Sequence, residues 1–199
     1  MSDGRTVLSY DADSDQSGLE MEIALLREQL ARAERRVEEL TALADRDPLV
    51  GVLNRRAFTR ETARAIAGRA RHGHDSVLVA VDVEGLKRIN DAHGRGAGDA
   101  VLAHVGQVLA AHVRTTDAVG RLCADEFAVL LAFADAEAAE RKMHRLARRI
   151  ADEPVIIADT AITVPIRYAV AAIDPSAGAE DQLALLSVTL HQKKASVIA

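Results

Sequence analysis

The segment from Ser76 to Val83 constrains the fold more than any other part of the chain. Its sequence, SVLVAVDV, is apolar and mostly β-branched apart from Ser76 and Asp82. A short run that is apolar at odd and even positions alike is typical of a strand with both faces buried. We therefore expect a central buried strand that has an aspartate close to its end.

Helical and extended patterns alternate around this strand. Hydrophobic periodicity and end signals predict helices over residues 55–71, 84–93, 100–113, 135–150 and 180–195, with a loop over 94–98. Strands are predicted over residues 119–122 and 127–133, joined by a tight polar turn, and two more within 155–173. This order predicts an α/β fold with a central mixed sheet flanked by helices.

The first part of the chain follows a different pattern. Residues 1–18 are polar and show no hydrophobic periodicity, which predicts a flexible tail.

Residues 19–46 are predicted to form a coiled-coil helix that joins two chains as a parallel homodimer, and residues 47–199 the globular domain. Glu22 and Arg27 fall at g and e positions, where a parallel partner would bring them together. An amphipathic helix packed on its own domain is the alternative. The coiled-coil prediction rests on an apolar seam with alternating spacings of four and three: Leu19, Ile23, Leu26, Leu30, Ala33, Val37, Leu40 and Ala44.

Composition and charge exclude several classes of protein. Hydrophobic residues make up 49% of the 199 residues, enough for one globular domain and a short additional element. The net charge of −5 and the aromatic content of 3% argue against nucleic-acid binding and membrane-surface binding. Cys123 is the single cysteine, which excludes an intrachain disulfide, and neither a secretory leader nor an apolar run of eighteen residues is found. We therefore expect a cytoplasmic protein without membrane insertion.

Three carboxylates fall where open sheets place their ligand sites. Asp82 ends the predicted central strand, and Asp125 and Glu126 lie at the tip of the predicted hairpin. Brought together, they would repel one another unless a hard cation such as Mg²⁺ neutralised them. Such a cluster suits phosphoryl or nucleotidyl transfer from a nucleoside triphosphate. Acidic residues in turns are often only solvated. The alternative that a given one of these three residues has no function therefore stays open.

Four segments resemble, in the same order, the motifs of GGDEF domains. DPLVGVLNRRAF at 47–58 is similar to D-x-L-T-G-L-x-N-R-R-x-F, and VDVEGLKRIND at 81–91 is similar to D-I-D-x-F-K-x-I-N-D. GRGAGDAVL at 94–102 resembles G-H-x-x-G-D-x-x-L, and RLCADEF at 121–127 resembles R-x-G-G-D-E-F. The chain is identified as a degenerate member of this family, with the palm fold of nucleotidyl cyclases, and residues 47–199 as its degenerate GGDEF domain. The match is good over about 45–135 and weaker over 155–199.

The resemblance implies a role for several residues. Active members of the family are diguanylate cyclases, in which two domains each hold one GTP and condense the pair to cyclic di-GMP. Asp125 would be the catalytic acidic residue. Asp82, Glu126 and the carbonyl of Val83 would bind Mg²⁺ if nucleotide enters the degenerate site. The implied substrate-binding residues are Lys87 and Lys194 for phosphate, and Asn90 and Asp99 for the guanine edge.

Other positions depart from the family pattern. Cys123 and Ala124 replace two glycines, which elsewhere let the backbone approach the triphosphate and adopt positive φ. If the turn needs positive φ here, the replacements cost about 1 kcal/mol or more. Together the departures predict weak or absent cyclase activity. The remaining ones are Arg95 for histidine, Arg167, Tyr168 and Ala169 for S-I-G, and His191 and Lys193 for tyrosine and alanine.

A further short motif resembles a second site of the family. Arg114 and Asp117 form R-x-x-D, with Asp117 six residues before Cys123, which resembles the inhibitory site that binds cyclic di-GMP. Arg141 and Arg145 lie four apart on the next predicted helix and would complete that site. A guanidinium can pair bidentately with phosphate or a guanine edge. A local ion pair and a solvated helix face are the alternatives.

These observations predict a signalling protein that binds cyclic di-GMP through the R-x-x-D site and has little or no cyclase activity. A protein partner, whose identity the sequence leaves open, would receive the signal. One alternative is an active diguanylate cyclase with GTP as substrate. The other is a dimeric scaffold that binds no nucleotide and acts through its helices.

Overall fold

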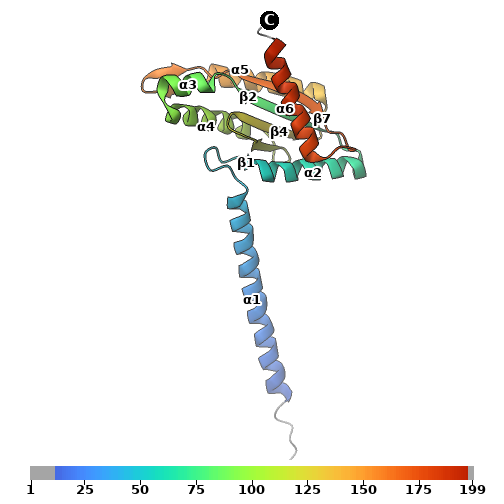
Figure 1. The fold of residues 1–199 in the computed structure, drawn as a ribbon. Coiled ribbons are helices and arrows are strands. Elements are labelled where there is room, and N and C mark those ends of the chain that lie inside the picture. The colour runs from blue at the N-terminus through green and yellow to red at the C-terminus, as the bar shows by residue number, and fades with distance from the viewer. Residues whose placement is uncertain (1–11, 197–199) are drawn as a thin grey trace, which may run out of the picture. The chain divides into compact units, whose positions relative to one another are not determined.

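The computed structural model describes the backbone of residues 12–196, and side chains over 19–192 except 38, 39, 42 and 43. The chain divides into two compact units, residues 1–44 and 45–199. The first contains helix α1, Ala12–Ala44 (Figure 1). Residues 12–18, expected in the tail, are thus helical, and the helix ends two residues before the expected boundary. None of the described helices is long and apolar enough to cross a membrane.

The apolar seam of α1 is exposed wherever the structure describes its leucine, isoleucine and valine side chains. Their exposed fractions run from 46% at Ile23 to 62% at Val37. An exposed seam with this spacing is suited to pairing with a second helix. The parallel coiled-coil dimer stays a prediction.

The second unit contains a five-stranded sheet with the strand order β1-β3-β4-β2-β7. β1 runs parallel to β3, and the other neighbours pair antiparallel. This confirms the predicted mixed sheet. The strands are β1 (Leu53–Asn54), β2 (Ser76–Val83), β3 (Ala118–Arg121), β4 (Glu126–Ala132) and β7 (Ile166–Ala172).

Helices cover both faces of the sheet (Figure 1). They are α2 (Arg55–His72), α3 (Leu86–His93), α4 (Arg95–Ala111), α5 (Ala136–Asp152) and α6 (Ala179–Ser196).

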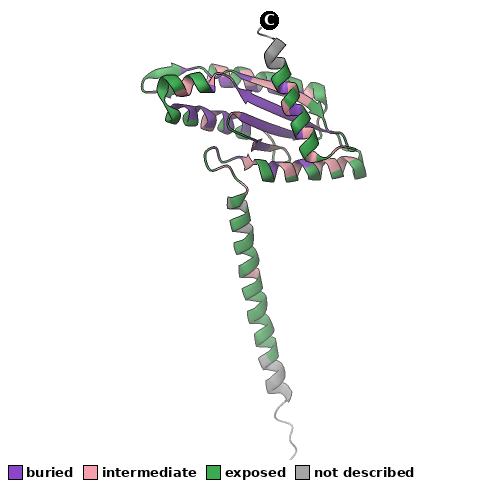
Figure 2. Ribbon diagram, in the orientation of Figure 1, coloured by how far each residue is buried: buried purple, intermediate pink, exposed green. Residues whose placement is uncertain are grey.

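Every residue of β2 is buried, as Figure 2 shows for the centre of the sheet. Val77, Val79 and Val81 belong to the core that includes residues of α4 and α5. Leu78 and Ala80 belong to the core on the opposite face, with residues of α2 and α6. Alternate side chains of a strand point to opposite faces, so this segment is apolar throughout because both of its faces are covered.

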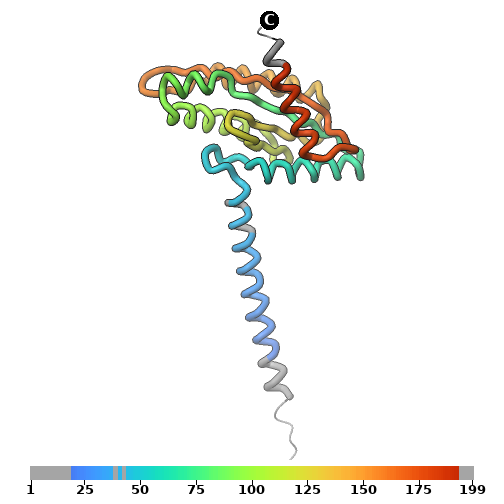
Figure 3. Tube along the Cα trace, in the orientation of Figure 1, coloured from blue at the N-terminus to red at the C-terminus, as the bar shows by residue number. Residues whose placement is uncertain are grey.

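Two local predictions were wrong. Residues 95–98 are not a loop, because α4 begins at Arg95 and only Gly94, at φ 82°, separates it from α3 (green in Figure 3). Residues 155–173 contain three strands rather than two: besides β7, the strands β5 (Val155–Ile157) and β6 (Thr160–Ile162) form a separate hairpin. Its turn places Ala158 and Asp159 at positive φ, without the Asn-Gly pair that usually marks such a turn.

The polar residues of the 47–58 segment have structural roles. Asn54 caps α2, because its side chain accepts a hydrogen bond from the Ala57 N–H at 3.0 Å. Asp47 Oδ1 accepts from the Leu49 and Val50 N–H groups at 3.0 and 3.1 Å. The side chain of Phe58 is fully buried. This segment therefore fixes the loop before α2 and anchors the helix on the sheet.

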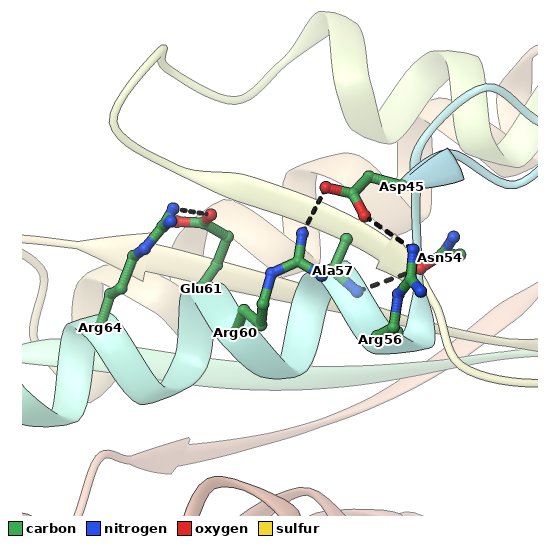
Figure 4. Close-up of polar contacts among 7 residues, drawn as sticks. All are labelled: Asp45, Asn54, Arg56, Ala57, Arg60, Glu61 and Arg64. Atoms are coloured by element: carbon green, nitrogen blue, oxygen red, sulfur yellow. Dashed lines mark hydrogen bonds and ion pairs between the residues drawn. The ribbon is translucent and has the colours of Figure 1, made fainter. Parts of the chain in front are cut away.

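Asp45 joins the start of the second unit to α2. Its carboxylate accepts hydrogen bonds from Arg60 and, at 3.3 Å, from Arg56, as Figure 4 shows. The Arg60 hydrogen bond, followed by the charge of Arg60 and the contact with Arg56, lowers the pKa of Asp45 below its usual value. A carboxyl with a lowered pKa stabilises the folded chain above its unfolded pKa of about 3.9, and this contribution is lost as the pH falls through the folded value.

We expect Asp45→Asn to lower the thermal unfolding midpoint slightly at pH 7, and this difference to shrink as the pH falls through the folded pKa of the Asp45 carboxyl. The reason is that protonation of the wild-type carboxyl removes the charge that Arg60 contacts. Thermal unfolding followed by circular dichroism over a series of falling pH values checks this. A difference of the same size at every pH would contradict the assigned pKa direction.

Candidate functional site

The hairpin between β3 and β4 is held by Arg121. Its guanidinium donates to the carbonyls of Cys123 and Ala124 at 3.2 and 2.7 Å, and it contacts Asp47 at 3.2 Å. Among the described residues other than glycine, only Phe133, Ala158 and Asp159 have positive φ. The backbone strain considered for Cys123 and Ala124 is therefore absent, and what distinguishes this tip from Gly-Gly is the space that two side chains occupy.

Two of the three predicted acids are neighbours in the sheet. Asp82 and Glu126 lie opposite each other in the β2–β4 pairing and are 5% and 6% exposed. The Val83 N–H donates to the Asp125 carbonyl at 3.0 Å, which ties the hairpin tip to the end of β2. The Asp125 side chain is half-buried at that tip. The sheet register thus places Asp82 and Glu126 opposite each other, with the backbone of Asp125 next to the end of β2.

Two of these carboxylates already have strong partners within the protein. Arg167 on β7 donates from Nη2 to Asp82 Oδ2 at 2.5 Å. Ser187 on α6 donates from Oγ to Glu126 Oε1 at 2.5 Å, and the thiol of Cys123 contacts Glu126 Oε2 at 3.4 Å. Sequence reasoning missed Arg167 and Ser187 as partners of the acids.

As folded, this arrangement does not fit a divalent cation. Within the described part of the chain, no three His, Cys, Asp or Glu side chains are grouped so that they could hold a metal ion. A guanidinium lies against Asp82, and both oxygens of Glu126 are hydrogen-bonded. The assignment of Mg²⁺ to Asp82, Val83 and Glu126 stays a prediction.

Cys123 is an exposed free thiol. Partial burial of its sulfur, followed by the hydrogen bond and charge of Glu126, raises the pKa of this thiol above its usual value. The thiolate is the reactive form of cysteine, so a raised pKa makes this residue less nucleophilic than an ordinary surface cysteine.

The residues proposed to read guanine lie on α3 and α4. Asn90 Oδ1 is buried and has no hydrogen-bond partner in the described structure. It lies against Gly98, where a Cβ would be 2.0 Å from it, and Asp99 follows on the exposed side of α4. Lys87 is exposed one turn before Asn90. A buried acceptor without a hydrogen-bond partner suits a donor group of a guanine edge. Lys194 lies within α6, but its side chain is outside the described residues.

The contact between Asn90 and Gly98 gives a stability prediction. Gly98→Ala should destabilise the domain by about 1 kcal/mol, because the new Cβ displaces the Asn90 amide in a packed site. Gly96→Ala is the matched control, since it lies in the same helix with nothing within 4 Å of its Cβ. Gly96→Ala should stabilise the domain by about 0.5–1 kcal/mol, because alanine has a higher helix propensity than glycine. Urea unfolding compares the two, and equal effects would contradict the packing described.

The R-x-x-D residues lie beside a basic surface. The Asp117 side chain is only 3% exposed and accepts from the N–H groups of Arg114 at 3.0 Å and Ala132 at 3.1 Å. Lys142 Nζ lies 3.3 Å from the same carboxylate. Asp117 therefore fixes the loop that presents the exposed Arg114.

A groove of about 790 Å³ opens next to Arg114, between the loop after α4 and helix α5. We call it the basic groove. A smaller hollow of about 240 Å³ shares three of its residues and reaches Asp117 and Phe133. Arg141 lines neither cavity and pairs with Glu137 on the exposed side of α5. The basic groove is lined by His112, Arg114, Lys142, Arg145, Leu146, Arg148, Arg149, Asp152 and Glu153.

Sequence reasoning missed Lys142, Arg148 and Arg149 in this groove. The sequence did contain a signal for Lys142 and Arg149. Residues 142, 145 and 149 are spaced three and then four apart, which places them on one face of a helix. The four-residue spacing of Arg141 and Arg145 drew attention to a neighbouring face instead.

The chain is similar to known proteins in sequence and in fold. The chain is 38% identical over 108 residues to the diguanylate cyclase DgcP of Pseudomonas aeruginosa, covering 54% of this chain and 16% of that protein. The fold resembles the coiled coil and GGDEF domain of DgcB from Caulobacter crescentus, solved in complex with c-di-GMP, with a TM-score of 0.78 and 20% identity over 89% of this chain and 95% of that one. It also resembles the diguanylate cyclase SiaD of P. aeruginosa, solved with its activator SiaC, with a TM-score of 0.72 and 24% identity over 93% of this chain and 78% of that one.

The chain spans only a small part of the length of DgcP, and the two structural likenesses show the fold alone. The sequence match to the family is broader. Residues 44–194 match the family described as "Diguanylate cyclase, GGDEF domain", and the chain therefore belongs to the GGDEF domain family.

Proposed function

We propose that this domain is a receptor for cyclic di-GMP and makes little or none of it. The observation that carries the proposal is the basic groove, in which Arg114, Lys142 and Arg145 meet beside the buried Asp117. Cyclic di-GMP presents two phosphodiesters and two guanine edges. Guanidinium groups can pair bidentately with either, and such charge-assisted hydrogen bonds are among the strongest in proteins.

Arg114 and Arg145 are proposed to contact the ligand, and Asp117 to act chiefly by positioning the loop. The carboxylate of Asp117 is buried and already receives two backbone hydrogen bonds and the Lys142 contact. Arg141 is engaged with Glu137 and would contribute less. Lys142 and Arg148 add positive charge that attracts an anionic ligand.

The low cyclase activity is supported by the surroundings of the acids. Arg167, Ser187 and Cys123 contact the carboxylates that would have to bind Mg²⁺, and the Ala124 Cβ stands where the family has glycine. Asp125, at the tip of the hairpin, is the proposed catalytic acid for any residual cyclase activity. A parallel dimer through α1, a cytoplasmic location and a protein partner belong to the same proposal, and the SiaD–SiaC complex is a precedent for a partner.

An active cyclase is the second candidate function, because the buried Asn90 Oδ1 has no hydrogen-bond partner in the described structure and suits a donor group of a guanine base. Incubating the full chain with GTP and Mg²⁺ and measuring cyclic di-GMP by chromatography distinguishes the two. We expect no accumulation above background for the wild type. Activity that appears only after Cys123→Gly with Ala124→Gly would locate the block in the hairpin tip.

Titration calorimetry with cyclic di-GMP tests the receptor proposal on the full chain. Arg114→Ala and Arg145→Ala should each weaken binding about tenfold or more, because a hydrogen bond to a charged group contributes about 1.5–3 kcal/mol. Arg141→Ala is the matched control, with the same side chain and charge lost from the same helix, and should change affinity less than about threefold. Equal losses in all three would point to a general charge effect rather than a built site.

A further inference from the structure

The acids at the end of β2 need a positive partner. Asp82 and Glu126 are almost fully buried on adjacent strands. Burying two carboxylates side by side is unfavourable unless cations or hydrogen bonds compensate them. Glu126 is compensated by hydrogen bonds from Ser187 and Cys123, which carry no charge. A positive charge must therefore come from elsewhere.

Arg167 provides it from the opposite neighbour of β2. It pairs with Asp82 in the β2–β7 register, so its side chain starts beside that carboxylate. Its Nη2 lies 2.5 Å from Asp82 Oδ2, and its Nε lies 2.7 Å from Glu84 Oε1. The Arg167 side chain is 23% exposed and bridges the carboxylates of Asp82 and Glu84.

We propose that the Arg167 guanidinium is a built-in cation that replaces a divalent metal ion at this site. A guanidinium carries a fixed positive charge, so it supplies a permanent counter-charge to the Asp82 carboxylate. A divalent cation bound to Asp82 would lie within a few ångströms of this guanidinium and be repelled by it, with little solvent to screen the repulsion. The domain thus keeps buried acids without needing bound metal. This inference is independent of cyclic di-GMP binding.

Removing the guanidinium should open a metal site. Mn²⁺ serves as the probe, with binding to the full chain measured by electron paramagnetic resonance without nucleotide. We expect Arg167→Ser to bind one Mn²⁺ per chain at least tenfold more tightly than the wild type. The double variant Arg167→Ser with Asp82→Asn should lose that gain. Arg71→Ser, which removes the same charge from an exposed position at the end of α2, should match the wild type.

Thermal unfolding gives a second readout that holds even if the variant is unstable. In buffer with a metal chelator, Arg167→Ser should unfold at a lower temperature than the wild type. Millimolar Mn²⁺ should raise the thermal unfolding midpoint of Arg167→Ser by mass action. The wild-type midpoint should be the same with chelator and with Mn²⁺.

Three results would each overturn the proposal. One is that the wild type binds Mn²⁺ as tightly as Arg167→Ser does, and that Asp82→Asn abolishes this binding. Another is a folded Arg167→Ser chain that gains no Mn²⁺ site. The third is an unstable Arg167→Ser chain whose folding Mn²⁺ does not restore.

Discussion

Asp117→Ala is expected to lower the free energy of unfolding by about 3 kcal/mol and to abolish measurable cyclic di-GMP binding. The substitution leaves the N–H groups of Arg114 and Ala132 without their acceptor and removes the partner of Lys142. Because these groups lie around a nearly buried side chain, water replaces the lost contacts poorly. The loop that presents Arg114 would then lose its fixed position. Urea unfolding and titration calorimetry on the same preparation measure both effects.

Asp152→Ala is the control for this prediction. Asp152 is an exposed carboxylate that lines the same groove, so its loss should change stability by no more than about 0.5 kcal/mol. It should leave the affinity for an anionic ligand equal or slightly higher, because a negative charge is removed. If Asp117→Ala were as stable as Asp152→Ala, the hydrogen bonds assigned to Asp117 would be wrong.

Phe58→Ala should cost about 4 kcal/mol of stability, which is the usual range for deleting a buried aromatic ring. Phe58 has no exposed surface and belongs to the core between β2 and the helices α2 and α6. Gly120 on β3 makes room for it, since a Cβ there would lie 2.6 Å from the Phe58 Cβ. The loss of the ring therefore leaves a cavity directly beneath the strand that leads into the hairpin.

The matched control is Phe133→Ala, which removes the same ring from a side chain that is 63% exposed. Its effect should stay within about 1 kcal/mol, since the ring buries little apolar surface and its main contact is an edge-on one with His74. Denaturant midpoints of the two variants, read by circular dichroism, give the comparison. Similar losses for both would show that the core assignment of Phe58 is mistaken.

Much of the fold could be predicted because its elements are locally encoded. The strand 76–83 carries its own apolar pattern, and Asn54 and Asp135 are capping residues that mark the starts of α2 and α5. The loop predicted at 94–98 was wrong because Gly96 and Gly98 suggested a break. Gly98 is instead a helical residue whose missing side chain leaves room for Asn90. The β5–β6 hairpin was missed because Ala158 and Asp159 adopt positive φ without a sequence signal.

Part of the site could be predicted because the order of the motifs along the chain indicates which strands are neighbours. The pairing of Asp82 with Glu126 follows from a central strand next to a hairpin. The contact of Arg167 with Asp82 joins residues 85 positions apart, and that of Ser187 with Glu126 joins residues 61 positions apart. No local pattern encodes such contacts, and they come from the part of the chain that resembles the family least. Only the three-dimensional arrangement shows that Asp82 and Glu126 already have partners within the protein.

The most direct test of the central claim is a calorimetric titration of the wild-type full chain with cyclic di-GMP at moderate salt. We expect saturable binding with a dissociation constant in the micromolar range or tighter, which corresponds to about −8 kcal/mol. The same protein, given GTP and Mg²⁺, should form no cyclic di-GMP. Absence of binding at high micromolar ligand, or steady production of cyclic di-GMP from GTP, would contradict the view that this domain binds the signal rather than makes it.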